Sequence, residues 1–208
     1  MAKPSKLSPT PDAAVRTRRA YFDCKFGQLH VRTAFPSTGG FDEHVTLFCL
    51  HPQDGSSRTF ARFLPEIATG RSVYAPDLPG FGESDPAPSF GPADAARAIS
   101  DLASDLRLRQ IDLLGMGFGA AVAVELAAAR PELVRRVVLT RLAPVDPLPA
   151  MKQECLILRL KLGAVDDAAW SKAALPHARF VELAEYAEDL FDAAPKTLAK
   201  HVHAFLGA

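Results

Sequence analysis

The amino-acid sequence predicts an α/β fold, in which a mostly parallel, twisted sheet is covered by helices on both faces. Short apolar runs of strand length alternate along the chain with segments whose apolar residues recur at helical spacing. One of these runs, 45–50, is almost continuously apolar, which is typical of a strand buried on both faces. Loops rich in Gly, Pro and Asp follow the runs, as expected at the ends of strands.

The first predicted helix covers 60–67, where apolar residues recur at i, i+3, i+4 and i+7 and Ser56 or Ser57 can cap the start. Pro65 lies inside this pattern and disfavours its later half. The remaining elements are an opening hairpin at 21–33, strands at 45–50, 72–75, 111–114, 134–140, 155–162 and 180–183, and helices at 95–106, 120–130 and 195–206.

Length and charge favour one neutral domain. We assign residues 19–208 of the 208 to a single domain and residues 1–18 to a flexible tail. Lys and Arg total 24, as do Asp and Glu, so the formal net charge is zero. Neutralising phosphates needs a concentrated basic surface, and no run of Lys or Arg exceeds two residues. We therefore expect no nucleic-acid partner.

The cysteines and apolar stretches predict a cytoplasmic protein. Cys24, Cys49 and Cys155 form no C-x-x-C pair and adjoin apolar stretches, so we expect small buried residues and neither disulfides nor a metal site. Residues 1–18 lack the apolar core of a secretory signal. The longest apolar stretch, 113–129, is too short and interrupted to cross a bilayer, so we expect no membrane partner.

A glycine-rich turn between the predicted strand 111–114 and the next helix has two interpretations. Gly115, Gly117 and Ala120 satisfy the dinucleotide pattern G-x-G-x-x-A. That pattern also needs an acidic residue after the next strand, where Arg141 stands instead; Arg141 would suit only a 2′-phosphate. The second interpretation is a nucleophile elbow, G-x-S-x-G. We favour the second and expect no cofactor.

Landmarks on both sides of this turn make the chain resemble the α/β-hydrolase fold family. They are the oxyanion-type loop at 50–57, the D-x-P-G-x-G-x-S loop at 77–84, the elbow at 115–119, the Pro-Glu-Leu-Val segment at 131–134 and the last helix at 195–206. The resemblance runs from about Tyr21 to the end. Many members insert a helical cap of several dozen residues, whereas the short Pro-rich connection 141–154 implies a member with no cap domain.

The catalytic triad that the resemblance implies is incomplete. Gly117 stands where family members place the nucleophile and has no side chain to attack a carbonyl. Glu188 stands at about the position of the catalytic His. Asp166 or Asp167 could occupy the acid position, and Asp146 follows the preceding strand.

The oxyanion loop is partly kept. The implied donors are the backbone amides of Gln53 and Phe118, and Met116 and His51 adjoin them. Pro52 replaces the usual Gly and fixes the local φ, which alters the path of the loop. The other histidines are expected at surface or capping positions: His30, His44, His177, His201 and His203.

Two functions remain open. Without nucleophile and base, the chain is expected to be a binding scaffold for a protein or a small apolar or ester-like ligand. The alternative is an active hydrolase of ester- or lactone-type substrates whose acid/base set comes from His51, Asp77, Glu188 or Asp189. Without a cap, apolar surface is left over the strand ends, which favours a homodimer.

Overall fold

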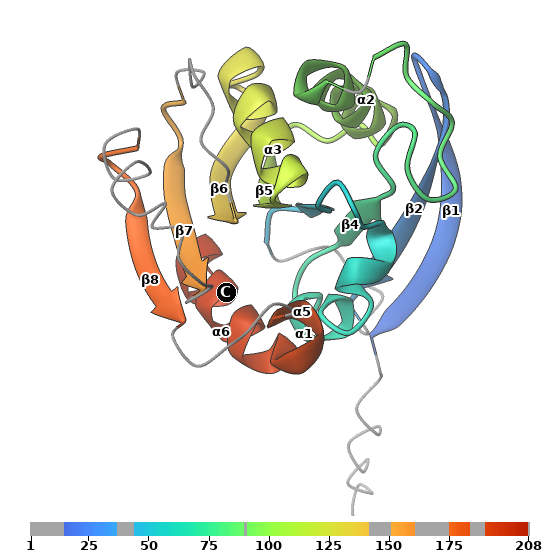
Figure 1. Ribbon diagram of the computed structural model, residues 1–208. Coiled ribbons are helices and arrows are strands. Elements are labelled where there is room, and N and C mark those ends of the chain that lie inside the picture. Colours follow the sequence, from blue (N-terminus) through green and yellow to red (C-terminus); the bar gives the residue numbers. More distant parts are fainter. Residues whose placement is uncertain are drawn as a thin grey trace, which may run out of the picture.

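The computed structural model describes residues 15–36, 44–89, 91–141, 151–160, 175–183 and 190–207. An eight-stranded sheet runs through the molecule in the order β1-β2-β4-β3-β5-β6-β7-β8 (Figure 1). The strands are β1 (Arg16–Cys24), β2 (Gly27–Phe35), β3 (Leu47–Leu50), β4 (Val73–Pro76), β5 (Ile111–Met116), β6 (Val134–Thr140), β7 (Glu154–Leu160) and β8 (Arg179–Leu183). Strands β3 to β8 run parallel to one another, each pairing with its neighbours in this order, while β1 and β2 form an antiparallel hairpin whose strand β2 pairs antiparallel with β4. The predicted α/β class with a mostly parallel sheet is confirmed.

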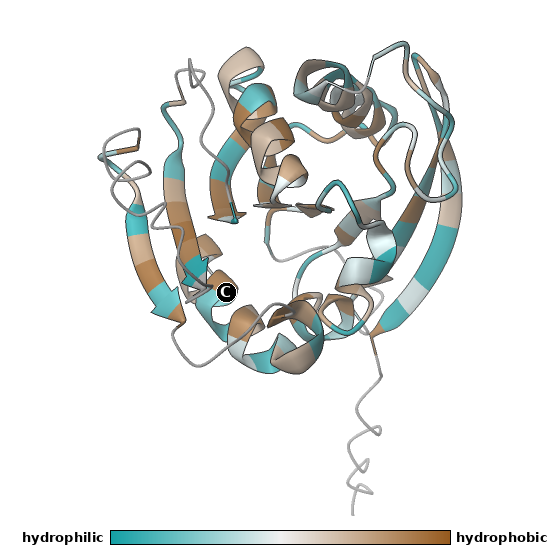
Figure 2. Ribbon diagram, viewed as in Figure 1, coloured by the Kyte–Doolittle hydropathy of each residue, from teal (hydrophilic) through white to brown (hydrophobic). Residues whose placement is uncertain are grey.

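Helices cover both faces of this sheet. They are α2 (Pro92–Asp105) and α3 (Phe118–Ala129) on one face, and the 3₁₀ turn η1 (Ser57–Phe60), α1 (Leu64–Ile67), α5 (Leu190–Ala193) and α6 (Pro195–Leu206) on the other (Figure 1). Successive residues of one strand serve opposite layers: Leu113 packs with α2 and α3, and Leu114 packs with α1 and α6. The apolar runs follow from this two-sided burial, and Figure 2 shows brown bands in the middle of β7 and β8, with teal toward their ends.

Several boundaries differ from the prediction. The helix expected at 60–67 is broken into η1 and α1, and Pro65 lies in the first turn of α1, where its missing N–H costs no hydrogen bond. Strand β1 begins at Arg16, so residues 16–18 belong to the hairpin and not to the tail. Helix α3 begins at Phe118, two residues earlier than expected. The short α5 was not predicted.

A buried ion network at the amino end of β5 ties down the last helix. Asp112 is fully buried and accepts hydrogen bonds from Arg135 at 2.6 and 2.9 Å and from Arg71 at 3.3 Å. Arg71, also fully buried, donates to the carbonyl of Gly207 at 2.6 Å, and Arg135 donates to that of Leu206 at 2.8 Å. The cations thus satisfy carbonyl groups at the end of α6. Nothing in the sequence analysis singled out these residues.

The connection between β6 and β7 consists of residues 141–153 alone, which is too short for a cap domain. Among the described residues, none of the helices has both the length and the apolarity to cross a bilayer.

Candidate active site

The turn between β5 and α3 lies where the sequence predicts the nucleophile elbow. Gly117 lies at its centre with φ 57° and ψ −117°, a conformation that costs a residue with a side chain about 1–3 kcal/mol. Its amide donates to the carbonyl of Thr140 at 3.0 Å, and its carbonyl accepts from the amide of Ala120 at 3.0 Å. The strained turn is therefore fixed on both sides although it presents no nucleophile.

The oxyanion-type loop packs directly against this turn. The amide of Gly119 donates to the carbonyl of His51 at 3.0 Å, and a Cβ added at Gly119 would overlap the carbonyls of Leu50 and His51. A Cβ added at Gly117 would lie 3.2 Å from the Cβ of Pro52, tighter than an ordinary carbon–carbon contact. The proline that departs from the family pattern thus crowds the space in which a nucleophilic side chain would begin.

His51 holds the loop and has no nitrogen left for proton transfer. Its Nε2 accepts a hydrogen bond from the amide of Leu78 at 2.8 Å, so the proton lies on Nδ1, which donates to the carbonyl of Pro52 at 2.7 Å. Burial lowers the pKa of the ring, which therefore stays neutral at pH 7. The structure favours the predicted role of shaping the loop.

Asp77 organises the second loop through a set of hydrogen bonds. Its carboxylate accepts from the amides of Ser57 at 2.6 Å and Glu83 at 2.9 Å and from Nδ1 of His30 at 2.9 Å. Burial raises the pKa of Asp77, but these hydrogen bonds outweigh it and hold the pKa below its usual range. The carboxylate is thus a structural anchor, ill suited to carry a proton at neutral pH.

His30 was predicted at the surface, and this is wrong. The side chain is 3% exposed and lies against Asp77, and its ring packs at 5.4 Å from that of Tyr21. Strand β2 buries both of its faces at residues 29–31, since it lies between β1 and β4 and below the Asp77 loop. Two cues could have placed it: the flanking apolar residues, and the need of Asp77 for a partner.

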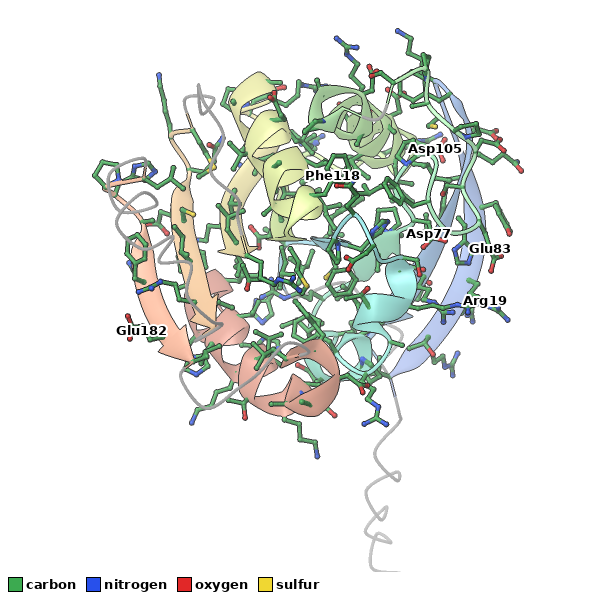
Figure 3. All side chains as sticks on the ribbon, viewed as in Figure 1. Arg19, Asp77, Glu83, Asp105, Phe118 and Glu182 are labelled. Carbon is green, nitrogen blue, oxygen red and sulfur yellow. The ribbon has the colours of Figure 1, made fainter. Side chains whose placement is uncertain are left out.

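Two backbone donors and two aromatic rings lie around this turn. In the described part of the chain, the amides of Gln53 and Phe118 have no hydrogen-bond partner. The half-buried rings of Phe81 and Phe118 lie 5.9 Å apart, and Phe81 packs edge-on to His51 at 5.4 Å. Met116 is buried at the end of β5. Figure 3 shows Phe118 at the start of α3, above the strands.

Several predicted site residues lie outside the described residues: Asp146, Asp166, Asp167, Glu188 and Asp189. Their roles stay predictions. Within the described ranges, no group of three His, Cys, Asp or Glu side chains is arranged to hold a metal ion.

Curated relatives match parts of the chain. A 2-hydroxymuconate semialdehyde hydrolase of Pseudomonas sp. (strain CF600) is 41% identical over 91 residues, which cover 40% of this chain and 30% of the relative. A haloalkane dehalogenase of Bradyrhizobium diazoefficiens is 32% identical over 117 residues, covering 56% and 37%. The chain spans less than half the length of these relatives.

Solved structures share the fold over most of the chain. A predicted CIB-like hydrolase from Thermoplasma acidophilum superposes with a TM-score of 0.79 at 18% identity, covering 92% of this chain and 98% of that one. The family model described as "Alpha/beta hydrolase family" matches residues 47–207, which include both loops and the elbow. With the sheet order, the elbow geometry and the two loops, this match shows that the chain belongs to the alpha/beta hydrolase family.

Proposed function

We propose that this domain binds a small apolar, ester-like ligand at the elbow and does not hydrolyse it by the family's Ser-His-Asp chemistry. The observation that carries the proposal is Gly117: it supplies no nucleophile, and Pro52 crowds the place where a side chain would start. The amides of Gln53 and Phe118 would receive the carbonyl oxygen of the ligand. The rings of Phe81 and Phe118 would contact its apolar part.

The names of the relatives favour a second candidate, an active hydrolase of ester- or lactone-type substrates with a non-standard acid/base set. Two of the four candidate groups are disfavoured as acid or base, because the polar side-chain atoms of His51 and Asp77 already form hydrogen bonds within the protein. Glu188 and Asp189 are the remaining groups for this alternative.

Two assays separate the candidates. We expect no hydrolysis of p-nitrophenyl butyrate above the buffer rate, and saturable binding of N-phenylbutanamide, an unreactive amide with the same acyl chain, by isothermal titration calorimetry. Phe118→Ala should weaken this binding by about tenfold, as expected for a buried aromatic contact, and Tyr21→Ala, at an exposed aromatic outside the site, should not.

Two other results would contradict the proposal. Ester turnover that disappears in Glu188→Ala or Asp189→Ala would establish the hydrolase instead. If the wild-type protein neither binds the amide nor hydrolyses the ester, the elbow is not a ligand site of this class.

A further inference from the structure

Two arginines face each other across the edge hairpin. Residues Arg19 and Arg32 are direct partners in the β1–β2 register, so both side chains project from the same face of the sheet. Like charges in such a pair repel. Among the described residues, neither side chain makes an ion pair within 4 Å. In the described part of the chain, the hairpin therefore holds two positive charges side by side without a direct ion-pair partner.

Arg32 also carries an unsatisfied donor. The side chain is half-buried between the hairpin and the layer of η1 and α1, and its Nε is buried with no hydrogen-bond partner in the described part of the chain. A buried donor on a charged group is costly unless something accepts from it. The carboxylate of Glu83 attracts Arg19, but it accepts from the Tyr21 hydroxyl at 2.8 Å and forms no ion pair with Arg19 within 4 Å in the described part of the chain.

Arg19 and Arg32 line a hollow of about 500 Å³, a volume typical of small-molecule sites. It lies between the hairpin and the η1–α1 segment and shares no residue with the elbow site. Figure 3 shows Arg19 on the outer strand, well apart from Phe118. The lining residues are Thr17, Arg18, Arg19, Arg32, Ala61 and Leu64.

We propose that this hollow binds a small phosphate monoester. Guanidinium groups present paired N–H donors that match phosphate oxygens, so one dianion held by Arg19 and Arg32 would cancel their repulsion. The hydroxyl of Thr17 adds a donor at the rim. Ala61 and Leu64 offer an apolar wall to the organic part of the ester, which inorganic phosphate lacks.

The test is isothermal titration calorimetry of the whole chain with butyl phosphate and, separately, with inorganic phosphate, at constant ionic strength. The wild-type protein should bind butyl phosphate saturably and more tightly than inorganic phosphate. Arg19→Met and Arg32→Met should each weaken binding by about tenfold or more, as expected for a charged hydrogen-bonded contact. Arg109→Met removes the same charge at an exposed position outside the hollow and should bind like the wild type.

A second readout concerns the free protein. Without ligand, Arg32→Met should melt at or above the wild-type temperature, because it removes a like-charge pair and an unsatisfied donor. Addition of butyl phosphate should raise the melting temperature of the wild type and of Arg109→Met only.

Three results would overturn the proposal. They are the absence of saturable binding to the wild type, equal affinity in the wild type and both hollow variants, and equal affinity for inorganic phosphate and its butyl ester. If Arg32→Met fails to fold, Arg19→Gln, at an exposed residue, decides the matter in the same assay.

Discussion

The contact between Pro52 and the elbow can be measured by placing a Cβ at Gly117. Gly117→Ala carries two costs: the positive φ of 57°, about 1–3 kcal/mol, and the approach of the new Cβ to 3.2 Å from the Cβ of Pro52, about 1 kcal/mol. We therefore expect unfolding free energy to fall by about 2–4 kcal/mol. Gly207→Ala isolates the first cost, because its φ is 80° and the nearest atom to an added Cβ is 3.8 Å away.

A double-mutant cycle isolates the second cost. Pro52→Gly removes the crowding Cβ, and Pro52→Ala removes the ring but keeps that atom. Combined with Gly117→Ala, the Pro52→Gly change should recover about 1 kcal/mol, whereas Pro52→Ala should be additive within about 0.3–0.5 kcal/mol. Replacing Pro52 by either residue also makes the loop more flexible. The single mutants Pro52→Gly and Pro52→Ala measure this effect on stability, so it cancels in the cycle.

Urea unfolding followed by circular dichroism measures each corner of the cycle, with equal m-values as the check on two-state behaviour. Two outcomes would refute the reasoning. If Gly117→Ala costs no more than Gly207→Ala, the crowding is absent. If Pro52→Ala restores as much stability as Pro52→Gly, the Cβ of Pro52 is not the atom responsible.

Three further predictions concern the core. Asp112→Ala leaves two arginines without their buried anion and should cost about 3–5 kcal/mol in urea unfolding, whereas Glu154→Ala, at an exposed ion pair, should cost less than about 1 kcal/mol. The pKa of the Asp77 carboxyl is lower in the folded state than in the unfolded state. The ionised carboxylate therefore stabilises the fold at pH values above the unfolded-state pKa, and this stabilisation is lost as the pH falls through the folded-state pKa. The difference in unfolding free energy between the wild type and Asp77→Asn, measured by urea unfolding, should be full at pH 7 and should narrow below about pH 4. Burial raises the pKa of all three thiols but hides only Cys49 and Cys155, so Cys24 alone should react with a disulfide reagent in the native state at pH 8, and all three should react in urea.

The arrangement of a sheet between two helix layers could be predicted from the sequence, because strands buried on both faces are rich in apolar residues. Strand β3 is an unbroken apolar run, because its adjacent residues pack into different layers. The same logic explains the error at 60–67. Phe60, Phe63 and Ile67 all pack into one core cluster, so their spacing stays helical although the 3₁₀ turn ends at Phe60 and α1 begins only at Leu64. Periodicity reports which face is buried and not whether the helix is continuous.

The site was predicted in outline because its landmarks are local motifs. The elbow glycines, the His51 loop and the Asp77 loop each stand within a few consecutive residues. The contacts that set their chemistry join distant positions: His30 with Asp77, His51 with Leu78 and Pro52 with Gly117. No spacing rule predicts such pairs, which depend on how β2, β3 and β5 align in the finished sheet.

Pro52 and Gly117 both depart from the family pattern, and the contact between these two positions links the two departures. With proline at 52, a serine at 117 would bear both the φ strain and the crowding, so glycine is the residue that both constraints favour. It follows that Gly117→Ser alone would restore a hydroxyl group but would destabilise the protein and displace the new side chain from the place where the family holds its nucleophile. A fair attempt to rebuild the family's chemistry changes Pro52→Gly and Glu188→His together with it, and ester hydrolysis by that variant alone would support all three positional assignments at once.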